Sequence, residues 1–480
     1  MATNPLLQEV LTNPADMDAR GVYADWLAES GDPRGSFIAL QMQLSQMTGL
    51  EVEYAAMFAE SARLKAEHQG RWIDQFVDAV FGDELELREQ QRFILLDRGE
   101  FDNGFLERLW LTPNQIAKYW DKVASYEPVT GIELIVDEDA PVHLEAARNW
   151  RKLRLHRDGW FAGPILARIL NWPLDNLRQL DCGDCDLGNL GARILANKET
   201  VLPRTEWPPV DLNLDQLTAL GLRGTNVTDG ELRMILGSYE FSSLRVLDIQ
   251  DCRLSEGATF RALTNLQALQ ELRLNVEHFP EELVGWDGIG RLTYLSLPAT
   301  MTTKVLSQLF PTASQTLRGL AGVGPTELLN KPELLTEVSS AFTDMCISAA
   351  TIVNEQFDKF ISADSMKTVR RLHAYACSMN DEAVESLIGN GPQNLVELDL
   401  CFNDLTDRSL FALADWKGAK NIVSLNLSAN RLFTRDGYQA LINSPYLDPV
   451  KLSVGPLFDQ QRIAAELVER FGDKVTLTWS

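Results

Sequence analysis

One short pattern of apolar residues recurs along most of the chain. It places apolar side chains at a first position and again three and five residues later, most clearly in 244–249, 395–400 and 422–427. Successive copies begin 23 to 27 residues apart, except for a first interval of 40. The copies begin at Leu177, Leu217, Leu244, Leu269, Leu292, Leu317, Phe342, Val369, Leu395, Ile422 and Leu447. A period kept over more than half of the chain predicts a repeat architecture rather than several globular domains.

Each copy has the composition of a strand followed by a helix. The apolar positions three and five alternate, as expected for a strand with one buried face, and helical stretches such as 407–415 and 437–442 follow. A single unit of this length cannot bury its own apolar face, so neighbouring units must stack. We therefore expect a parallel concave sheet with helices on the convex side. Weaker copies begin at Leu106, Gly131 and Trp150, and a last strand carries Val475 and Leu477.

A second pattern lies eight residues after the start of each copy. Asn and Cys are frequent there, and such side chains can satisfy backbone groups in the turn that leaves the strand. The residues at this position are Cys185, Thr225, Cys252, Thr300, Cys377, Asn403 and Asn430. With both patterns, the stretch from about residue 100 to 480 resembles the leucine-rich-repeat family, ribonuclease-inhibitor subtype, which implies an α/β horseshoe solenoid.

Two parts of the array depart from this pattern. Residues 197–211 lengthen the first interval, so we expect an inserted loop there. Pro325 and Ala350 stand at the eighth position of their copies, and Gly322 stands at a core position. The sequence therefore leaves the register between 317 and 368 open.

The first 48 residues predict a small helical domain. Pro5, Asp16 or Asp18, and Pro33 mark three helix starts, and Pro14 and Gly31 mark stops. The stretch 18–41 (DARGVYADWL, then GDPRGSFI and Gln41) resembles the bacterial repeat-companion domain, although Gly21 stands where that family usually has a larger apolar residue. The resemblance implies a modular bacterial repeat protein and no particular chemistry.

The cluster Asp25, Trp26, Asp32 and Arg34 could suggest a site in this domain. We expect instead that Tyr23 and Trp26 are core residues and that Asp32 caps a turn. Residues 49–104 are expected to form a helix over 54–70 and a junction that caps the first repeat. The predicted domains are thus 1–48, 49–104 and a solenoid over 105–480.

Composition narrows the possible partners and location. The net charge of −24 would repel phosphate backbones, so we expect no nucleic-acid partner and favour a protein with a basic surface. No apolar run reaches the length of a membrane span, the first residues lack a signal-peptide pattern, and six cysteines are too few for a disulfide framework. A cytoplasmic location is expected.

No cofactor or metal site is expected either. The nucleotide-binding, metalloprotease and hydrolase motifs do not occur, and Cys182 and Cys185 form a lone CxxC whose two positions the repeat register explains.

The candidate partner-binding residues lie at positions two, four and six, on the open face of the sheet. Aromatic and arginine side chains are typical interface anchors. The candidates are Arg371, His373, Tyr375, Tyr294, Arg273, Asp248 and Asp399. A second, basic stripe consists of Arg108, Lys152, Arg154 and His156.

The same face offers one catalytic alternative. Cys346, His373, Asp399 and Asn426 form a row that contains the ingredients of a nucleophilic triad, but the face is open and no oxyanion hole is evident. Asp344, Arg371 and Glu397 in the neighbouring row predict a ladder of charges.

The sequence raises two alternative roles. The protein could dock on a GTPase, nuclease or protease as an inhibitor or activator. A repeat-bearing ubiquitin ligase would carry a catalytic cysteine in a separate domain, whereas all six cysteines lie between 182 and 401, within the repeats. The sequence favours a non-enzymatic scaffold or regulatory subunit, and it does not identify the partner, the pathway or the oligomeric state.

Overall fold

In the computed structural model, the protein forms two compact units. The first unit holds residues 1–46 and 64–274, and the second holds 47–63 and 275–480. The described residues are 4–136, 141, 143–156, 163–196, 214–255, 257–274, 281–296, 303–313, 316–323, 329, 331–335, 341–348, 351–455, 457 and 461–477.

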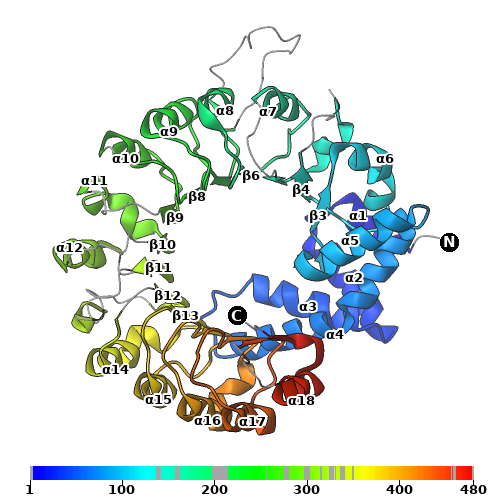
Figure 1. Ribbon diagram of the computed structural model, residues 1–480. Coiled ribbons are helices and arrows are strands. Elements are labelled where there is room, and N and C mark those ends of the chain that lie inside the picture. Colours follow the sequence, from blue (N-terminus) through cyan, green and yellow to red (C-terminus); the bar gives the residue numbers. More distant parts are fainter. Residues whose placement is uncertain are drawn as a thin grey trace. The chain divides into compact units, whose positions relative to one another are not determined.

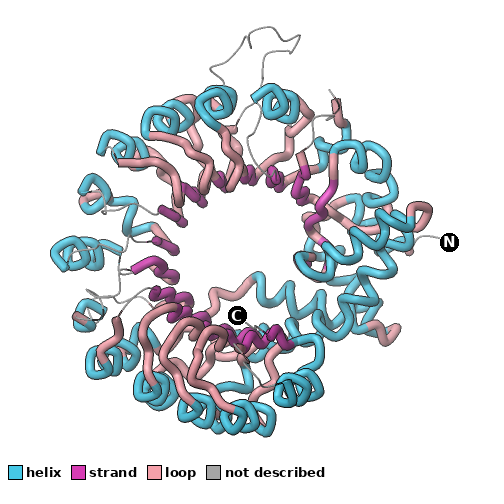
Figure 2. The backbone as a smooth tube through the Cα atoms, in the orientation of Figure 1, coloured by secondary structure: helices cyan, strands magenta, loops and turns pink. Residues whose placement is uncertain are grey.

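The repeats of the first unit form a parallel sheet in chain order. The strands are β3 (Arg108–Leu111), β4 (Gly131–Ile135), β5 (Lys152–His156), β6 (Gln179–Asp181), β7 (Ala219–Gly221), β8 (Val246–Ile249) and β9 (Glu271–Leu274). The helices that follow them are α6 (Pro113–Ala124), α7 (Gly163–Leu170), α8 (Gly188–Leu195), α9 (Asp229–Leu236) and α10 (Gly257–Leu263), with the 3-10 turn η1 (Glu145–Asn149). Figure 1 and Figure 2 show the helices of this unit on one face of its strands.

The second unit repeats this arrangement. Its parallel strands are β10 (Tyr294–Ser296), β11 (Gly319–Val323), β12 (Asp344–Ser348), β13 (Arg371–Tyr375), β14 (Glu397–Asp399), β15 (Ser424–Asn426), β16 (Lys451–Val454) and β17 (Val475–Leu477). Its helices are α11 (Glu281–Val284), α12 (Thr303–Ala313), α14 (Asn354–Ser362), α15 (Asp381–Asn390), α16 (Asp407–Asp415), α17 (Arg435–Asn443) and α18 (Gln461–Phe471). The 3-10 turns are η2 (Asp287–Arg291), η3 (Pro332–Leu335), η4 (Asp364–Met366), η5 (Lys417–Asn421) and η6 (Gly472–Lys474). The predicted leucine-rich-repeat solenoid is confirmed.

The apolar repeat positions form the core between strands and helices. Leu398, Leu425 and Leu452 lie side by side in register and are almost fully buried. The register that the sequence left open is also clear. Leu320 pairs with Met345, and β11 then holds one extra residue before the next pair, so the irregular copy stays in phase with its neighbours.

Strand pairing corrects the start of two copies. Ile132 pairs with Leu109 and Leu153, which both stand three residues after the start of their copies. The copy of Ile132 therefore begins at Val129 and not at Gly131. By the same register, the copy of β16 begins at Pro449 and not at Leu447. Side chains on a strand alternate with a period of two, so a shift of two residues keeps the same face apolar. The apolar pattern alone could not detect the error.

The residues at the eighth position form the predicted ladder. Five of these side chains donate a hydrogen bond to the backbone carbonyl at position five of the preceding copy, close to the C-terminal end of its strand and 29 or 30 residues earlier. The bonds are Cys185 to Leu155 (3.4 Å), Cys252 to Leu222 (3.0 Å), Cys377 to Ile347 (3.5 Å), Asn403 to Ala374 (2.8 Å) and Asn430 to Leu400 (3.0 Å). Thr225 instead donates to Leu222 of its own copy. Thr300 lies outside the described residues, as does the loop expected at 197–211.

The N-terminal residues form the three expected helices, α1 (Pro5–Thr12), α2 (Met17–Glu29) and α3 (Pro33–Ser45). Tyr23 is buried, and Asp32 caps α3 by accepting a hydrogen bond from the Arg34 backbone N–H, as predicted. The expectation that Trp26 is a core residue was wrong: it is 43% exposed and stacks on Tyr23. Trp26 lies three positions after Tyr23 on α2, and only part of the Trp26 ring is covered by other side chains.

A buried ion pair joins these helices to the first repeats. Arg34 donates both hydrogen bonds of one guanidinium nitrogen to Glu127, at 2.6 and 2.8 Å, and Glu127 also accepts from the Leu106 backbone N–H. The hairpin of β1 (Phe101–Asp102) and β2 (Phe105–Leu106) turns at Gly104, which has a φ of +81°. A Cβ at Gly104 would lie 2.1 Å from Ile38, so only glycine permits this approach.

The junction contains more helix than expected. In place of one helix over 54–70, it forms α4 (Tyr54–Phe81) and α5 (Leu85–Arg98). The first part of α4, to Arg63, belongs to the second unit. Within the described residues, no helix combines the length and the apolar character needed to cross a membrane.

The ladder leads to a stability prediction. Asn403 is buried, donates to Ala374 and accepts from the backbone N–H groups of Cys377 and Met379. Truncation to alanine leaves these buried backbone groups without hydrogen-bond partners. Asn403→Ala should therefore lower the free energy of unfolding by about 2 to 3 kcal/mol. Urea unfolding followed by circular dichroism measures the effect.

The exposed Asn390 provides the control. Its side chain bonds only at the surface, to Asp358, and Asn390→Ala should cost well under about 1 kcal/mol. Equal losses in the two variants would contradict a structural role for the ladder.

Candidate protein-binding surface

Strand β13 carries three of the predicted binding residues on one face. Leu372 and Ala374 are fully buried, and Arg371, His373 and Tyr375 alternate with them on the open face of the sheet, which is turned away from the helices. Because the strand is hydrogen-bonded on both sides, these side chains need little ordering when a partner binds.

Arg371 lies at the centre of the predicted charge ladder. Its guanidinium pairs with Asp344 at 3.0 Å on β12 and with Glu397 at 3.2 Å on β14. These three residues lie opposite one another in the strand register. The ladder is confirmed.

A segment of the chain itself covers the N-terminal end of β13. We call residues 47–63 the docked segment; it belongs to the same unit as β13. Arg371 donates to the Tyr54 hydroxyl at 3.5 Å and lies 5.3 Å from the centre of the Phe58 ring. Arg371 is therefore less accessible to a partner than its position on the strand suggests.

The side chain of the neighbouring arginine binds backbone carbonyls of the docked segment. Arg370 is only 3% exposed and donates to the carbonyls of Gly49 and Glu51 at 3.0 and 3.1 Å. The sequence analysis missed this residue. A signal was present, since the next two copies have Val396 and Val423 at the same position.

The residues of the proposed triad align as predicted but bond differently. Strand pairing places Cys346, His373, Asp399 and Asn426 in one row. His373, however, pairs with Glu397, with 3.7 Å between Nε2 and Oε2. Asp399 accepts from the Cys401 backbone N–H and from Asn426, at 2.9 and 3.1 Å. The carboxylate partner of the imidazole is thus Glu397.

Asp399 belongs to a set of residues that cap the ends of strands. Each of the four accepts a hydrogen bond from the backbone N–H two residues later, at 2.8 to 3.2 Å. The set is Asp181, Asp248, Asp399 and Asn426. Two predicted binding residues, Asp248 and Asp399, therefore also have a structural role.

An exposed aromatic pair lies at the C-terminal ends of β13 and β14. Tyr375 is 45% exposed and Phe402 is 60% exposed; their ring centres are 5.9 Å apart and the rings are nearly perpendicular. Phe402 has a φ of +55°, at a position where other copies have Asp184, Gly224 or Asp251. A bulky residue in this conformation is unusual and costs strain. The sequence analysis missed Phe402, although an aromatic residue in place of Asp or Gly was a usable signal.

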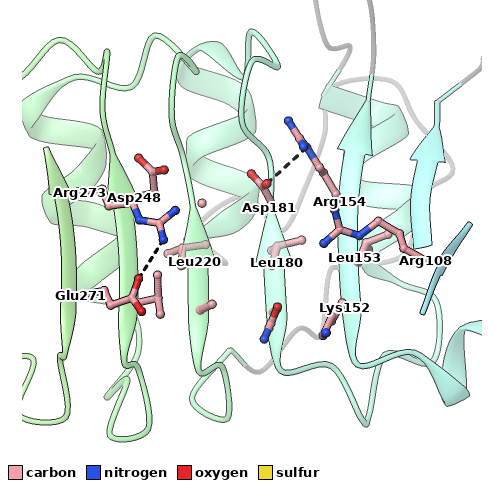
Figure 3. Close-up of a pocket in the computed structure, with 14 residues that line it drawn as sticks. Arg108, Lys152, Leu153, Arg154, Leu180, Asp181, Leu220, Asp248, Glu271 and Arg273 are labelled. Atoms are coloured by element: carbon pink, nitrogen blue, oxygen red, sulfur yellow. Dashed lines mark hydrogen bonds and ion pairs between the residues drawn. The ribbon is translucent and has the colours of Figure 1, made fainter. Parts of the chain in front are cut away.

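The other predicted residues lie elsewhere. Tyr294 is on β10, three strands from β13, and its ring covers Gly319, where a Cβ would be 2.3 Å from the ring. Asp248 and Arg273 belong to the first unit and line a hollow of about 330 Å³ on the open face of its sheet. Its floor includes the small residues Ala219 and Gly221 of β7. Figure 3 shows Asp248 and Asp181 on strands either side of Leu220.

Arg108, Lys152 and Arg154 of the predicted basic stripe line the same hollow, and carboxylates neutralise much of the charge of the stripe. Each basic side chain has an acidic partner at 3.2 to 3.7 Å. The pairs are Arg108–Glu100, Lys152–Glu107, Arg154–Asp181 and His156–Glu133. Glu107 and Glu133 are buried, and the sequence analysis did not anticipate them.

The cysteines of the CxxC pair are core residues. Cys182 and Cys185 are buried free thiols, and burial raises the pKa of Cys182 well above its ordinary value. Among the described residues, no group of three or more His, Cys, Asp or Glu side chains is arranged to hold a metal ion.

The pair of His373 and Glu397 leads to a prediction about pH. The contact with Glu397 raises the pKa of His373 above 6.5, and the contact with His373 lowers the pKa of Glu397 below 4.5. The histidine contribution to stability is complete below pH 6.5 and is lost as the pH rises through the raised pKa. The glutamate contribution is lost as the pH falls through the lowered pKa.

The stability difference between the wild type and His373→Gln should therefore be largest between pH 4.5 and 6.5 and should vanish in alkaline solution. Unfolding midpoints over this range measure the difference, and NMR titration of His373 in Glu397→Gln should show its pKa falling. A His373 pKa that does not respond to this substitution would refute the assigned pair.

Comparisons with known proteins give no family assignment. No family model matches the chain, and no curated protein matches it. Among solved structures, the complex of Rad7 and Elc1 in yeast matches with 17% identity and a TM-score of 0.36, over 55% of this chain and 77% of that chain. An internalin (inlF) from Listeria monocytogenes matches with 13% identity and a TM-score of 0.29, over 84% and 96%. The leucine-rich repeat-containing protein LegL7 from Legionella pneumophila matches with 15% identity and a TM-score of 0.35, over 62% and 91%.

Proposed function

We propose that this protein is a non-enzymatic recognition module, a scaffold or regulatory subunit that binds a protein partner on the open face of the second unit. The observation that carries the proposal is the exposed pair of Tyr375 and Phe402. Large aromatic side chains on a rigid sheet are characteristic anchors of protein interfaces.

The surroundings of the pair locate the contact more closely. The docked segment already covers the N-terminal end of β13 at Arg371, whereas His373 and Tyr375 are both more than 40% exposed. The partner is therefore expected at the C-terminal ends of β13 and β14. Arg371 acts there as a positioning residue that holds Glu397, and Glu397 in turn holds His373.

The cost of the pair also supports a binding role. Phe402 exposes a large apolar ring from a strained backbone conformation, and neither feature improves the packing of the repeat. Ala376 and Ala429 have the same left-handed conformation in the adjacent copies, so the turn does not require an aromatic residue. An interface would offset this cost by burying both rings.

Site-specific photocrosslinking can test the proposed surface. A benzoylphenylalanine placed at Tyr375 should capture a discrete protein in the native cell. The matched control position is Phe411 on α16, which is 45% exposed, as Tyr375 is. Crosslinking from 375 and not from 411 supports the proposal, and identical products from both positions would contradict it.

Once the partner is captured, its affinity for variants tests the anchor. Tyr375→Ala should weaken binding by roughly thirtyfold, corresponding to about 2 kcal/mol for a central aromatic anchor. Phe411→Ala should leave the affinity unchanged. Isothermal titration calorimetry measures both, and equal affinities for the wild type and Tyr375→Ala would remove the contact from this surface.

A further inference from the structure

We infer that the pair of Tyr375 and Phe402 receives a positively charged side chain, so that the partner presents a basic segment containing arginine or lysine. The inference rests on the proposed function of the same surface and adds the chemistry of its partner.

The geometry of the two rings favours a cation. Aromatic faces carry negative electrostatic potential, and a cation over such a face is attracted to it. The rings of Tyr375 and Phe402 meet at 89°, so the edge of one points at the other, and the two side chains are 45% and 60% exposed. A guanidinium or ammonium group can lie against an open face without displacing either ring.

The strand and turn that lead to Phe402 and continue past it carry carboxylates. On β14 and the turn after it, the carboxylates are Glu397, Asp399 and the exposed Asp404, two residues beyond Phe402. The basic side chains of β13 are Arg371 and His373, and both already pair with Glu397. Asp399 lies opposite His373, two residues before Tyr375, and Asp404 follows Phe402 by two residues. These carboxylates add negative charge at this end of the two strands that a basic partner can neutralise.

One arginine of the same strand already lies in such surroundings. At the other end of β13, the Arg371 guanidinium lies over Phe58 of the docked segment while Asp344 and Glu397 flank it. An aromatic ring and two carboxylates thus hold an arginine there. At the C-terminal end, Tyr375, Phe402 and the nearby carboxylates offer the same groups to a cation from outside the chain.

A charge-matched peptide pair tests the inference. The probe is an acetylated, amidated tetra-arginine peptide, and its control is the tetra-citrulline peptide, which keeps nearly the same side-chain length and shape but replaces the charged guanidinium by a neutral urea group. Titrated against the full chain at low salt, tetra-arginine should bind at least about tenfold more tightly. Equal binding of the two peptides would overturn the inference.

Binding at the aromatic site must be distinguished from general attraction to an acidic protein. Variants with an unchanged net charge make this distinction. Phe402→Ala should weaken tetra-arginine binding by about three- to thirtyfold, while Phe411→Ala should not change it. Phe402→Ala should fold, since Ala376 and Ala429 occupy the same backbone conformation. Unchanged binding in Phe402→Ala would show attraction to the overall charge alone and would overturn the inference.

The outcome is distinguishable from a failure of the proposed function. Crosslinking from Tyr375 without tetra-arginine binding would retain the surface and refute a basic partner, in favour of an apolar one. Site-specific tetra-arginine binding without a crosslinked protein would refute the protein-binding role instead. Asp404→Asn should weaken tetra-arginine binding and reduce its dependence on salt; an unaltered salt dependence would refute the part assigned to this carboxylate.

Discussion

The hydrogen bond from the eighth position of one repeat to the strand-end carbonyl of the preceding repeat is the interaction on which the structure depends. Parallel strands leave backbone groups unpaired where each strand turns away, and a buried unpaired group is costly. Asn403 satisfies several at once, since it donates to Ala374 and accepts from Cys377 and Met379. Cysteine can supply only one weak donor, as Cys377 does to Ile347. The copies with asparagine at the eighth position are therefore held to the preceding copy more strongly than the copies with cysteine there.

A sheet fixed in this way presents a regular grid of side chains on its open face. Every second residue of a strand faces outward, and neighbouring strands bring equivalent positions into rows. The grid explains why Arg371 meets Asp344 and Glu397, and why Asp248 and Asp399 share the task of capping strand ends. Many of the polar side chains on this face thus stabilise the sheet itself. The exposed pair of Tyr375 and Phe402 does not contribute to the stability of the sheet in this way.

The docked segment changes the meaning of the predicted binding stripe. Arg370 and Arg371 are consecutive in the sequence, yet both contact residues more than 300 positions earlier, Gly49 and Tyr54. Their contacts occupy one end of β13 and leave the other end, with Tyr375, available. A strand that looked like a uniform row of anchors therefore divides into an internal contact and an open surface.

The sequence by itself determined the repeat, the strand and helix order, the ladder and the rows of the open face, because each follows from a local period. It could not place the starts of the copies at Val129 and Pro449, because a shift of two residues preserves the apolar pattern. Only the tertiary structure decided that Trp26 is exposed, that Glu127 holds Arg34 and that the docked segment covers Arg371. The last two features join residues far apart in the sequence, and the exposure of Trp26 depends on which side chains of other elements cover α2; no periodic signal encodes either.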